Sequence, residues 1–315
     1  MNLTPSHDIV LAIQPDWVLE EEAMGSKQKF WFRIPEEGLS PEEGPLPEKG
    51  TVWLFKYPQP GTGQHWAEKI AAEIAEKLDI LHARVEFAEF GGVQGSATES
   101  FAREGRELFH GNQVLAGQVL GYDTAKKFRQ SSHTLGNIFA SLQSVYRRPE
   151  RAAAAMVRIA EYLVLDALIG NTDRHHENWG ILVKRTPRGM TGIVAPSFDH
   201  ASSLGRELRD DTPRKCRARI LREGRIGAYA ENAPGAIFWD AEDRRAVSPL
   251  ELVRRAAPMY PGHFRRALAS LDKLGRENLE SIVGRVPDDW MSDTARRFAI
   301  ELACYNLTQL KEIAL

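Results

Sequence analysis

The residues best suited to chemistry are Asp173, Asn178 and Asp199, which share one short stretch of the chain. Four residues separate Asp173 from Asn178 in NTDRHHENW, so a single loop must carry both. Two apolar runs follow, WGILVKR and TGIVAPSFD, and the Pro-Arg-Gly between them is typical of a β-hairpin. The second strand of that hairpin would return Asp199 to the loop. We therefore expect two carboxylates and one amide to converge on one point.

Oxygen-bearing side chains in this pattern suit phosphoryl transfer. Mg²⁺ prefers octahedral oxygen ligands, and it usually takes only one or two carboxylates together with substrate phosphates. In protein kinases a loop Asp accepts the proton of the substrate hydroxyl, while a loop Asn and a later Asp hold the metal. The D-x-x-x-x-N spacing of that loop is present here, and Asp199 stands where kinases have the Asp of D-F-G. The sequence therefore predicts Asp173 as the catalytic base, and Asn178 and Asp199 as metal ligands.

The same stretch departs from the eukaryotic kinase pattern. There is no H-R-D, because Arg174 and His175 follow the Asp, and the closing glycine, Gly205, is displaced. These departures indicate an atypical branch of kinases. A polar loop without function is the plain alternative. A zinc site built from His175, His176 and His200 is disfavoured, because adjacent His side chains point in different directions and no cysteine lies at ligand spacing.

The segments GNTDRHHEN and SFDHASSLG resemble the HipA family, bacterial Ser/Thr kinases first known as toxins of toxin–antitoxin pairs. The specific part of the resemblance is N-x-D-R-H-x-x-N. It implies a cytoplasmic Ser/Thr protein kinase that uses ATP and Mg²⁺, with an antitoxin as partner and a protein substrate such as an aminoacyl-tRNA synthetase. The chain lacks room for the extra N-terminal subdomain of full-length members, so we expect a compact form of the family.

A second group of candidate residues lies upstream. TVWLFKYP is typical of a strand with Lys56 near its end, and HWAEKIAAEIAEKLDI has the apolar spacing of an amphipathic helix. A strand Lys followed by a helix Glu is the arrangement in which kinases direct the Lys at the α- and β-phosphates. We expect Lys56 to bind the phosphates and Glu68 to be its partner, with Glu73 as second choice. A lysine at a sheet edge is the alternative without function.

A glycine between two strand-like stretches, Gly25 in AMGSKQKFWFRI, would let backbone N–H groups approach a phosphate. A hairpin turn with lysines is the default interpretation of such a segment. The HipA resemblance favours function, because the family has a G-x-Q-x-K loop over the ATP phosphates. It implies that Gly25, Ser26, Lys27 and Lys29 contact ATP, with Lys27 standing where the family has Gln.

Composition restricts the class of protein. The 315 residues are 43% hydrophobic and 27% charged, as in ordinary soluble globular proteins. Two cysteines make no disulfide framework, which suits a reducing cytoplasm. No apolar run is long enough to span a bilayer, and a net charge of −2 argues against DNA binding by the whole surface. We expect neither membrane association nor direct DNA binding.

The elements that must position these residues change in kind along the chain. Strand-like segments dominate the first third, and amphipathic helices such as PERAAAAMVRIAEYLVLDALIG dominate the rest. We predict an α+β, two-lobed protein-kinase-like fold. Residues 1–102 would form a small β-rich N-lobe with the ATP-binding sheet and one key helix. Residues 103–315 would form a mostly helical C-lobe with the catalytic loop and the metal loop.

Two other functions are compatible with the sequence. The chain could be a small-molecule phosphotransferase on a kinase-like fold, or a binding module that has lost activity. The presence of Lys56, Asp173, Asn178 and Asp199 together argues against the binding module. A basic run, residues 206–225, follows the metal loop, and two interpretations of it stay open: a docking surface for substrate, or a solvated helix face.

Overall fold

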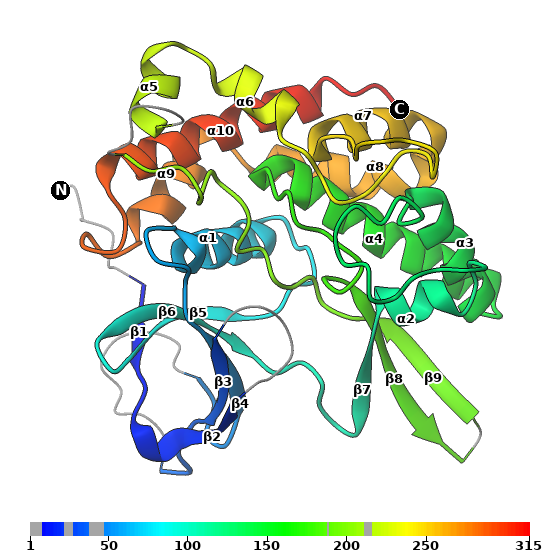
Figure 1. Ribbon diagram of the computed structural model, residues 1–315, viewed down its shortest axis with the longest axis horizontal. Helices are drawn as coiled ribbons and strands as arrows, with labels where there is room; N and C mark the ends of the chain where they lie inside the picture. The colour runs from blue at the N-terminus through cyan, green and yellow to red at the C-terminus, as the bar shows by residue number, and fades with distance from the viewer. Residues whose placement is uncertain (1–7, 22–27, 38–46, 188, 211–215) are drawn as a thin grey trace.

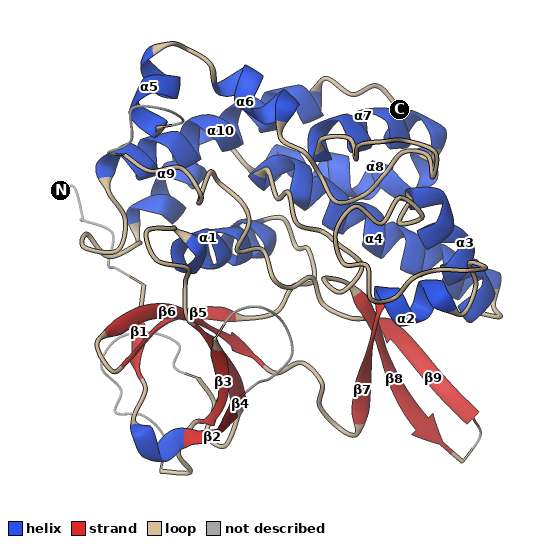
Figure 2. Cartoon of the chain, viewed as in Figure 1, coloured by secondary structure: helices blue, strands red, loops and turns tan. Residues whose placement is uncertain are grey.

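The computed structural model describes residues 8–21, 28–37, 47–187, 189–210 and 216–315. A β-rich part with one packed helix lies beside a larger helical part, as Figures 1 and 2 show. The strands are β1 (Val10–Ala12), β2 (Val18–Glu21), β3 (Lys29–Arg33), β4 (Val52–Lys56), β5 (Val85–Phe90), β6 (Val93–Glu99), β7 (Arg106–His110), β8 (Gly180–Thr186) and β9 (Gly189–Val194). The helices are α1 (Gln64–Lys77), α2 (Gly111–Ala116), α3 (Leu135–Val145), α4 (Pro149–Ile169), α5 (Arg217–Arg222), α6 (Ile226–Asn232), α7 (Pro249–Met259), α8 (Pro261–Ser270), α9 (Arg276–Gly284) and α10 (Asp293–Lys311). The predicted α+β, two-lobed kinase-like fold is confirmed.

The first sheet has six strands in the order β1-β5-β6-β4-β3-β2. Its pairs are antiparallel except for β1, which runs parallel to β5. Strand β4 lies inside the sheet, and Trp53 and Phe55 are buried in a core on one of its faces. Side chains alternate between the two faces of a strand. Lys56 therefore lies on the face opposite Phe55, and there it meets helix α1.

The hairpin expected after Asn178 is present as β8 and β9. These strands pair antiparallel from Ile181 with Val194 to Thr186 with Gly189, and β7 completes a three-stranded sheet. Beyond β9 the chain reaches the segment between α1 and β5, where Ser197 forms an isolated bridge with His82. The hairpin thus returns the segment before Asp199 to the junction of the two parts.

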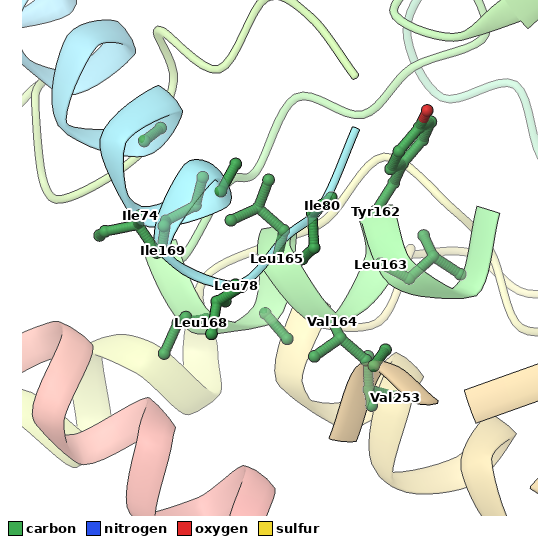
Figure 3. Close-up of a cluster of buried hydrophobic side chains, with 14 of the residues drawn as sticks. Ile74, Leu78, Ile80, Tyr162, Leu163, Val164, Leu165, Leu168, Ile169 and Val253 are labelled. Atoms are coloured by element: carbon green, nitrogen blue, oxygen red, sulfur yellow. The ribbon is translucent and has the colours of Figure 1, made fainter. Parts of the chain in front are cut away.

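Helix α4 is the centre of the larger part. All of residues 159–169 are buried, and the helix packs against α3, α7, α8 and α10. A helix that is apolar on every side needs such surroundings. Figure 3 shows Ile74 of α1 beside Ile169 of α4, and Leu78, directly after α1, beside Leu165 and Leu168 of α4, so one continuous core joins the two parts. None of the helices in the described ranges combines the length and apolarity needed to cross a bilayer.

The close approach of Gly205 to α10 provides a test of this packing. Gly205 has a φ of +70°, and a Cβ there would lie 2.4 Å from the Phe298 ring of α10. Gly205→Ala should therefore lower the free energy of unfolding by about 2 kcal/mol or more, because both the backbone and the core resist the methyl group. Urea denaturation followed by tryptophan fluorescence measures the change.

The matched control is Gly136→Ala, at an exposed position of α3 where the nearest atom to a Cβ lies 3.9 Å away. Alanine is the better helix former, so this variant should be neutral or more stable by about 0.5–1 kcal/mol. Equal destabilisation by the two substitutions would contradict the packing described for Gly205.

Candidate active site

Lys56 lies at the junction between the sheet, α1 and the segment after β9. Its Nζ donates to Glu68 Oε1 at 2.8 Å and to Asp199 Oδ1 at 3.3 Å. Burial by itself would lower the pKa of Lys56, but the Asp199 and Glu68 carboxylates raise it above its usual range. The lysine is therefore a cation at neutral pH, held between two anions from distant parts of the chain.

Glu68, and not Glu73, is the helix partner of this lysine. The Glu68 side chain is 1% exposed, and it also accepts a hydrogen bond from Ser96 Oγ of β6 at 2.9 Å. Glu73 lies further along α1 and contacts Lys69 and Arg285 instead. The two carboxylates are five residues apart, so they project from different sides of the helix.

The loop after α4 carries Asp173 and Asn178. Helix α4 ends at Gly170, whose φ of 64° lets the chain leave the helix sharply. Asn178 Nδ2 donates to the Asp173 carbonyl oxygen at 2.8 Å, so the two residues close one compact loop, as the spacing predicts. The Asp173 carboxylate is 32% exposed and accepts a hydrogen bond from Ser202 Oγ at 3.4 Å.

Arg174 ties the loop to its surroundings. Its guanidinium group forms a bidentate pair with Asp166 of α4, at 2.7 and 2.8 Å. The same group donates to the Asn178 carbonyl oxygen at 2.6 Å and to Ser197 Oγ at 2.9 Å. This role of Arg174 was not predicted from the sequence. The sequence did contain a signal for it: Asp166 lies inside an apolar helix, and a buried carboxylate requires a partner.

Asp199 occupies an unusual backbone conformation. Its φ is 56°, in the left-handed region that few residues other than glycine adopt and that Asp tolerates better than most. The preceding residues are anchored, since Ala83 N donates to the Ser197 carbonyl oxygen at 2.8 Å and Arg174 Nη1 donates to that of Phe198 at 3.3 Å. Such strain is typical of functional sites, where the surroundings hold it in place.

The predicted phosphate loop is described only in part. Gly25, Ser26 and Lys27 lie outside the described residues. Lys29 begins β3 and is the register partner of Lys56 on β4. The backbone of Lys29 therefore lies beside that of Lys56.

The histidines near the loop are buried and engaged. His176 Nδ1 lies 2.8 Å from Tyr122 Oη, and His200 Nε2 lies 2.7 Å from Ser197 Oγ. Burial lowers the pKa of His175 to about 3, so this ring is neutral at pH 7 although its Nε2 lies 3.9 Å from the Asp173 carboxylate. Within the described ranges, no group of three or more His, Cys, Asp or Glu side chains is placed to hold a metal ion.

The arginines of the basic run, residues 206–225, have different surroundings. Arg217 is buried, pairs with Asp210 at 2.9 Å and lies over the Trp66 ring, so it is structural. Arg219 pairs with Glu223 at 2.7 Å on the surface. Arg206 Nη2 donates to Ser202 Oγ at 3.1 Å, which places a cation one side chain away from Asp173. Arg214 and Lys215 lie outside the described residues.

Asp166 and Asp173 should respond differently to truncation. Asp166→Ala removes the partner of buried Arg174, so it should lower the free energy of unfolding by about 3–5 kcal/mol. Asp173→Ala removes a partly exposed carboxylate and should change that free energy by about 1 kcal/mol or less. Denaturant titration of both variants measures the difference, and a comparable loss in both would rule out this division between a structural and an available carboxylate.

Comparisons with known proteins agree with this geometry. Residues 22–254 match the family model described as the HipA-like C-terminal domain. The fold is similar to the crystal structure of the Helicobacter pylori proinflammatory kinase CtkA, with a TM-score of 0.73 at 16% identity, over 98% of this chain and 100% of that one. A search of curated proteins found no match.

A second similar structure is that of HipA from Shewanella oneidensis MR-1, determined in complex with HipB and its operator DNA. The TM-score is 0.53 at 15% identity, over 93% of this chain and 65% of that one. At such identities the two structures show a shared fold. The family match covers most of the sequence and includes every residue of the Lys56, Asp173 and Asp199 site. The chain therefore belongs to the HipA-like C-terminal domain family.

Proposed function

We propose that this protein is a HipA-type Ser/Thr protein kinase that uses ATP and Mg²⁺. The contact of Lys56 with both Glu68 and Asp199 carries the proposal. In protein kinases the Lys–Glu pair and the metal-binding Asp must both be in place for transfer. Membership of the HipA-like family and the kinase-like fold support the same conclusion.

The donor set fits a metal–nucleotide complex. Asp199 offers a partly exposed carboxylate, and Asn178 uses its Nδ2 within the loop and its backbone carbonyl oxygen with Arg174, which leaves the side-chain Oδ1 as the ligand atom. Mg²⁺ bound there with the nucleotide would neutralise phosphate charge. Lys56 would hold the α- and β-phosphates, with Glu68 fixing its orientation, and Gly25, Ser26, Lys27 and Lys29 would cover the phosphates.

Asp173 would act as the catalytic base. Its carboxylate is partly exposed, so a substrate hydroxyl can reach it. Neutral His175 adds no positive charge beside it, while Ser202 orients one of its oxygens. The carboxylate, held by the loop, would accept the hydroxyl proton while the acceptor oxygen bonds to the γ-phosphorus of ATP and the bond from that phosphorus to the oxygen it shares with the β-phosphate breaks, which releases ADP.

The adenine would bind where the two parts of the chain meet. Phe101 follows β6, and its ring lies 5.3 Å from that of Phe198, the residue before Asp199. The His110 ring, at the end of β7, lies 6.3 Å from the same Phe198 ring in an edge-on arrangement. We accordingly propose that the boundary between an N-lobe, residues 1–102, and a C-lobe, residues 103–315, lies beside the rings of Phe101, Phe198 and His110.

The partners we propose follow from the family. The Shewanella HipA structure contains an antitoxin-type assembly of HipA, HipB and operator DNA. By analogy, this chain would act in the cytoplasm, phosphorylate a protein such as an aminoacyl-tRNA synthetase and bind an antitoxin protein, with DNA contacts left to that partner.

Substitution of the two acids should separate their roles. Asp199→Ala should weaken binding of Mg-ATP, whereas Asp173→Ala should leave binding nearly unchanged and reduce turnover by about 10²-fold or more. Calorimetry with a non-hydrolysable ATP analogue measures binding, and transfer of radiolabelled phosphate measures turnover. Glu177→Ala is the matched control, because this loop acid pairs with Lys127 at 2.9 Å and should be dispensable. Full activity of Asp173→Ala would refute its role.

The substrate class can be tested directly. Radiolabelled ATP and the wild-type protein are incubated with a bacterial protein fraction and, separately, with a small-molecule fraction. We expect label on protein, with phosphoserine or phosphothreonine after acid hydrolysis. Label confined to the small-molecule fraction would instead identify a small-molecule phosphotransferase on a kinase-like fold.

A further inference from the structure

One face of α1 is held by residues that come from distant parts of the chain. His65, Lys69 and Glu73 follow each other at intervals of four, so they share this face. Glu68 precedes Lys69 by one residue and is rotated by about 100° around the helix axis. Contacts of the first three side chains fix the rotation of α1 about its axis, and they therefore also fix the direction of Glu68.

The middle of this face contacts strand β5. Lys69 Nζ lies 2.7 Å from Glu86 Oε2 and 2.8 Å from Glu73 Oε1. Burial by itself would lower the pKa of Lys69, but the carboxylates of Glu86, Glu73 and Asp8 raise it. The lysine is charged at neutral pH, and it binds α1 to the sheet one residue away from Glu68.

Arg285 connects the same face of α1 to Asp8, at the beginning of the described chain. It follows α9, and its guanidinium Nη2 contacts the Glu73 carboxylate. Its Nε lies 2.9 Å from Asp8 Oδ1, and its carbonyl oxygen accepts from Asp8 N at 2.9 Å. Arg285 thus bridges α1 and the segment that leads into β1.

The first turn of α1 is held by an aromatic contact. The His65 ring packs edge-on against Trp290 at 5.5 Å, and its Nε2 lies 3.3 Å from the Trp290 carbonyl oxygen. Burial lowers the pKa of His65 to about 4, so the neutral ring donates this hydrogen bond at pH 7. Trp290 in turn packs on Phe87 of β5 at 4.9 Å.

Together these residues form what we call the α1 clamp: His65, Lys69, Glu73, Glu86, Asp8, Arg285 and Trp290. Of these, Asp8, Arg285 and Trp290 lie outside residues 22–254, which match the family model. We propose that Arg285 is a positioning residue for phosphoryl transfer, which holds α1 in the orientation that brings Glu68 to Lys56. This role rests on the proposed function, because the Lys56–Glu68 pair matters only if Lys56 binds phosphates.

Removal of the Arg285 guanidinium group would change how α1 is held. Without the guanidinium group, Glu73 and Asp8 keep their negative charges but lose the cation that joins them, and Glu73 remains close to Lys69 and Glu86. Lys69 and His65 still hold the helix, but the contact between Glu73 and Arg285 is lost, so the part of α1 around Glu73 can turn away from the segment that follows α9. Turning α1 separates Glu68 from Lys56, which lowers the population of the competent arrangement.

The test compares Arg285→Met, Arg285→Lys and the control Arg276→Met. Arg276 begins α9 and pairs with Glu301 of α10 at 3.0 Å, so its substitution removes a nearby ion pair that does not involve α1. With radiolabelled ATP and myelin basic protein as acceptor, Arg285→Met should lower the rate at saturating ATP by about tenfold, with a smaller change in ATP affinity. Arg285→Lys should recover part of the rate, and Arg276→Met should match wild type.

Hydrogen exchange gives a readout that does not depend on activity. In Arg285→Met, the amides of residues 64–77 should exchange faster, while those of α10 stay as in wild type. Unchanged exchange in α1, an unchanged rate despite faster exchange, or an equal effect of Arg276→Met would each overturn the proposal. If the wild-type protein transfers no phosphate, the proposed function is wrong. Unchanged hydrogen exchange of α1 in Arg285→Met would show, independently of activity, that Arg285 does not hold this helix.

Discussion

A buried ammonium group shared by two carboxylates determines how the parts of this protein fit together. Lys56 comes from the sheet, Glu68 from the helix that covers it, and Asp199 from the segment that follows a hairpin far along the chain. Burying a charge without partners costs several kcal/mol, so the packed arrangement of the sheet, α1 and the segment around Asp199 must be one that gives Lys56 its partners. The same three groups are those that phosphoryl transfer requires in one place.

A second cation, the buried Arg174, likewise joins elements that are distant in the sequence. Its planar guanidinium group meets Asp166 with two parallel hydrogen bonds and still reaches the Asn178 carbonyl oxygen and Ser197. Arginine suits this position because it presents several donors in a fixed plane and stays charged. The loop that carries Asp173 and the segment that leads to Asp199 are consequently joined by one side chain.

The apolar core and the charged contacts have different tasks. The core that joins α1 to α4 holds the two parts together through non-directional burial, and it tolerates small shifts of one helix against another. The ion pairs of Lys56, Arg174 and the α1 clamp are directional, because each requires particular atoms at hydrogen-bond distance. Packing therefore brings the elements into contact, and the charged side chains select the orientation in which Glu68 faces Lys56.

Local spacing in the sequence was sufficient to predict the loop of Asp173 and Asn178, the hairpin before Asp199 and the apolar face of α1, because periods of two and 3.6 residues are properties of neighbouring positions. The fold class followed from the same signals and from the HipA resemblance. Only the tertiary structure decided that Glu68 rather than Glu73 meets Lys56, that Arg174 joins two loops, and that Arg217 is buried beside Trp66. The partners in these contacts are distant in the sequence: Glu68 lies 12 positions after Lys56, and Ser197 lies 23 positions after Arg174. Such pairs form only when the packed elements have already set the distance between them.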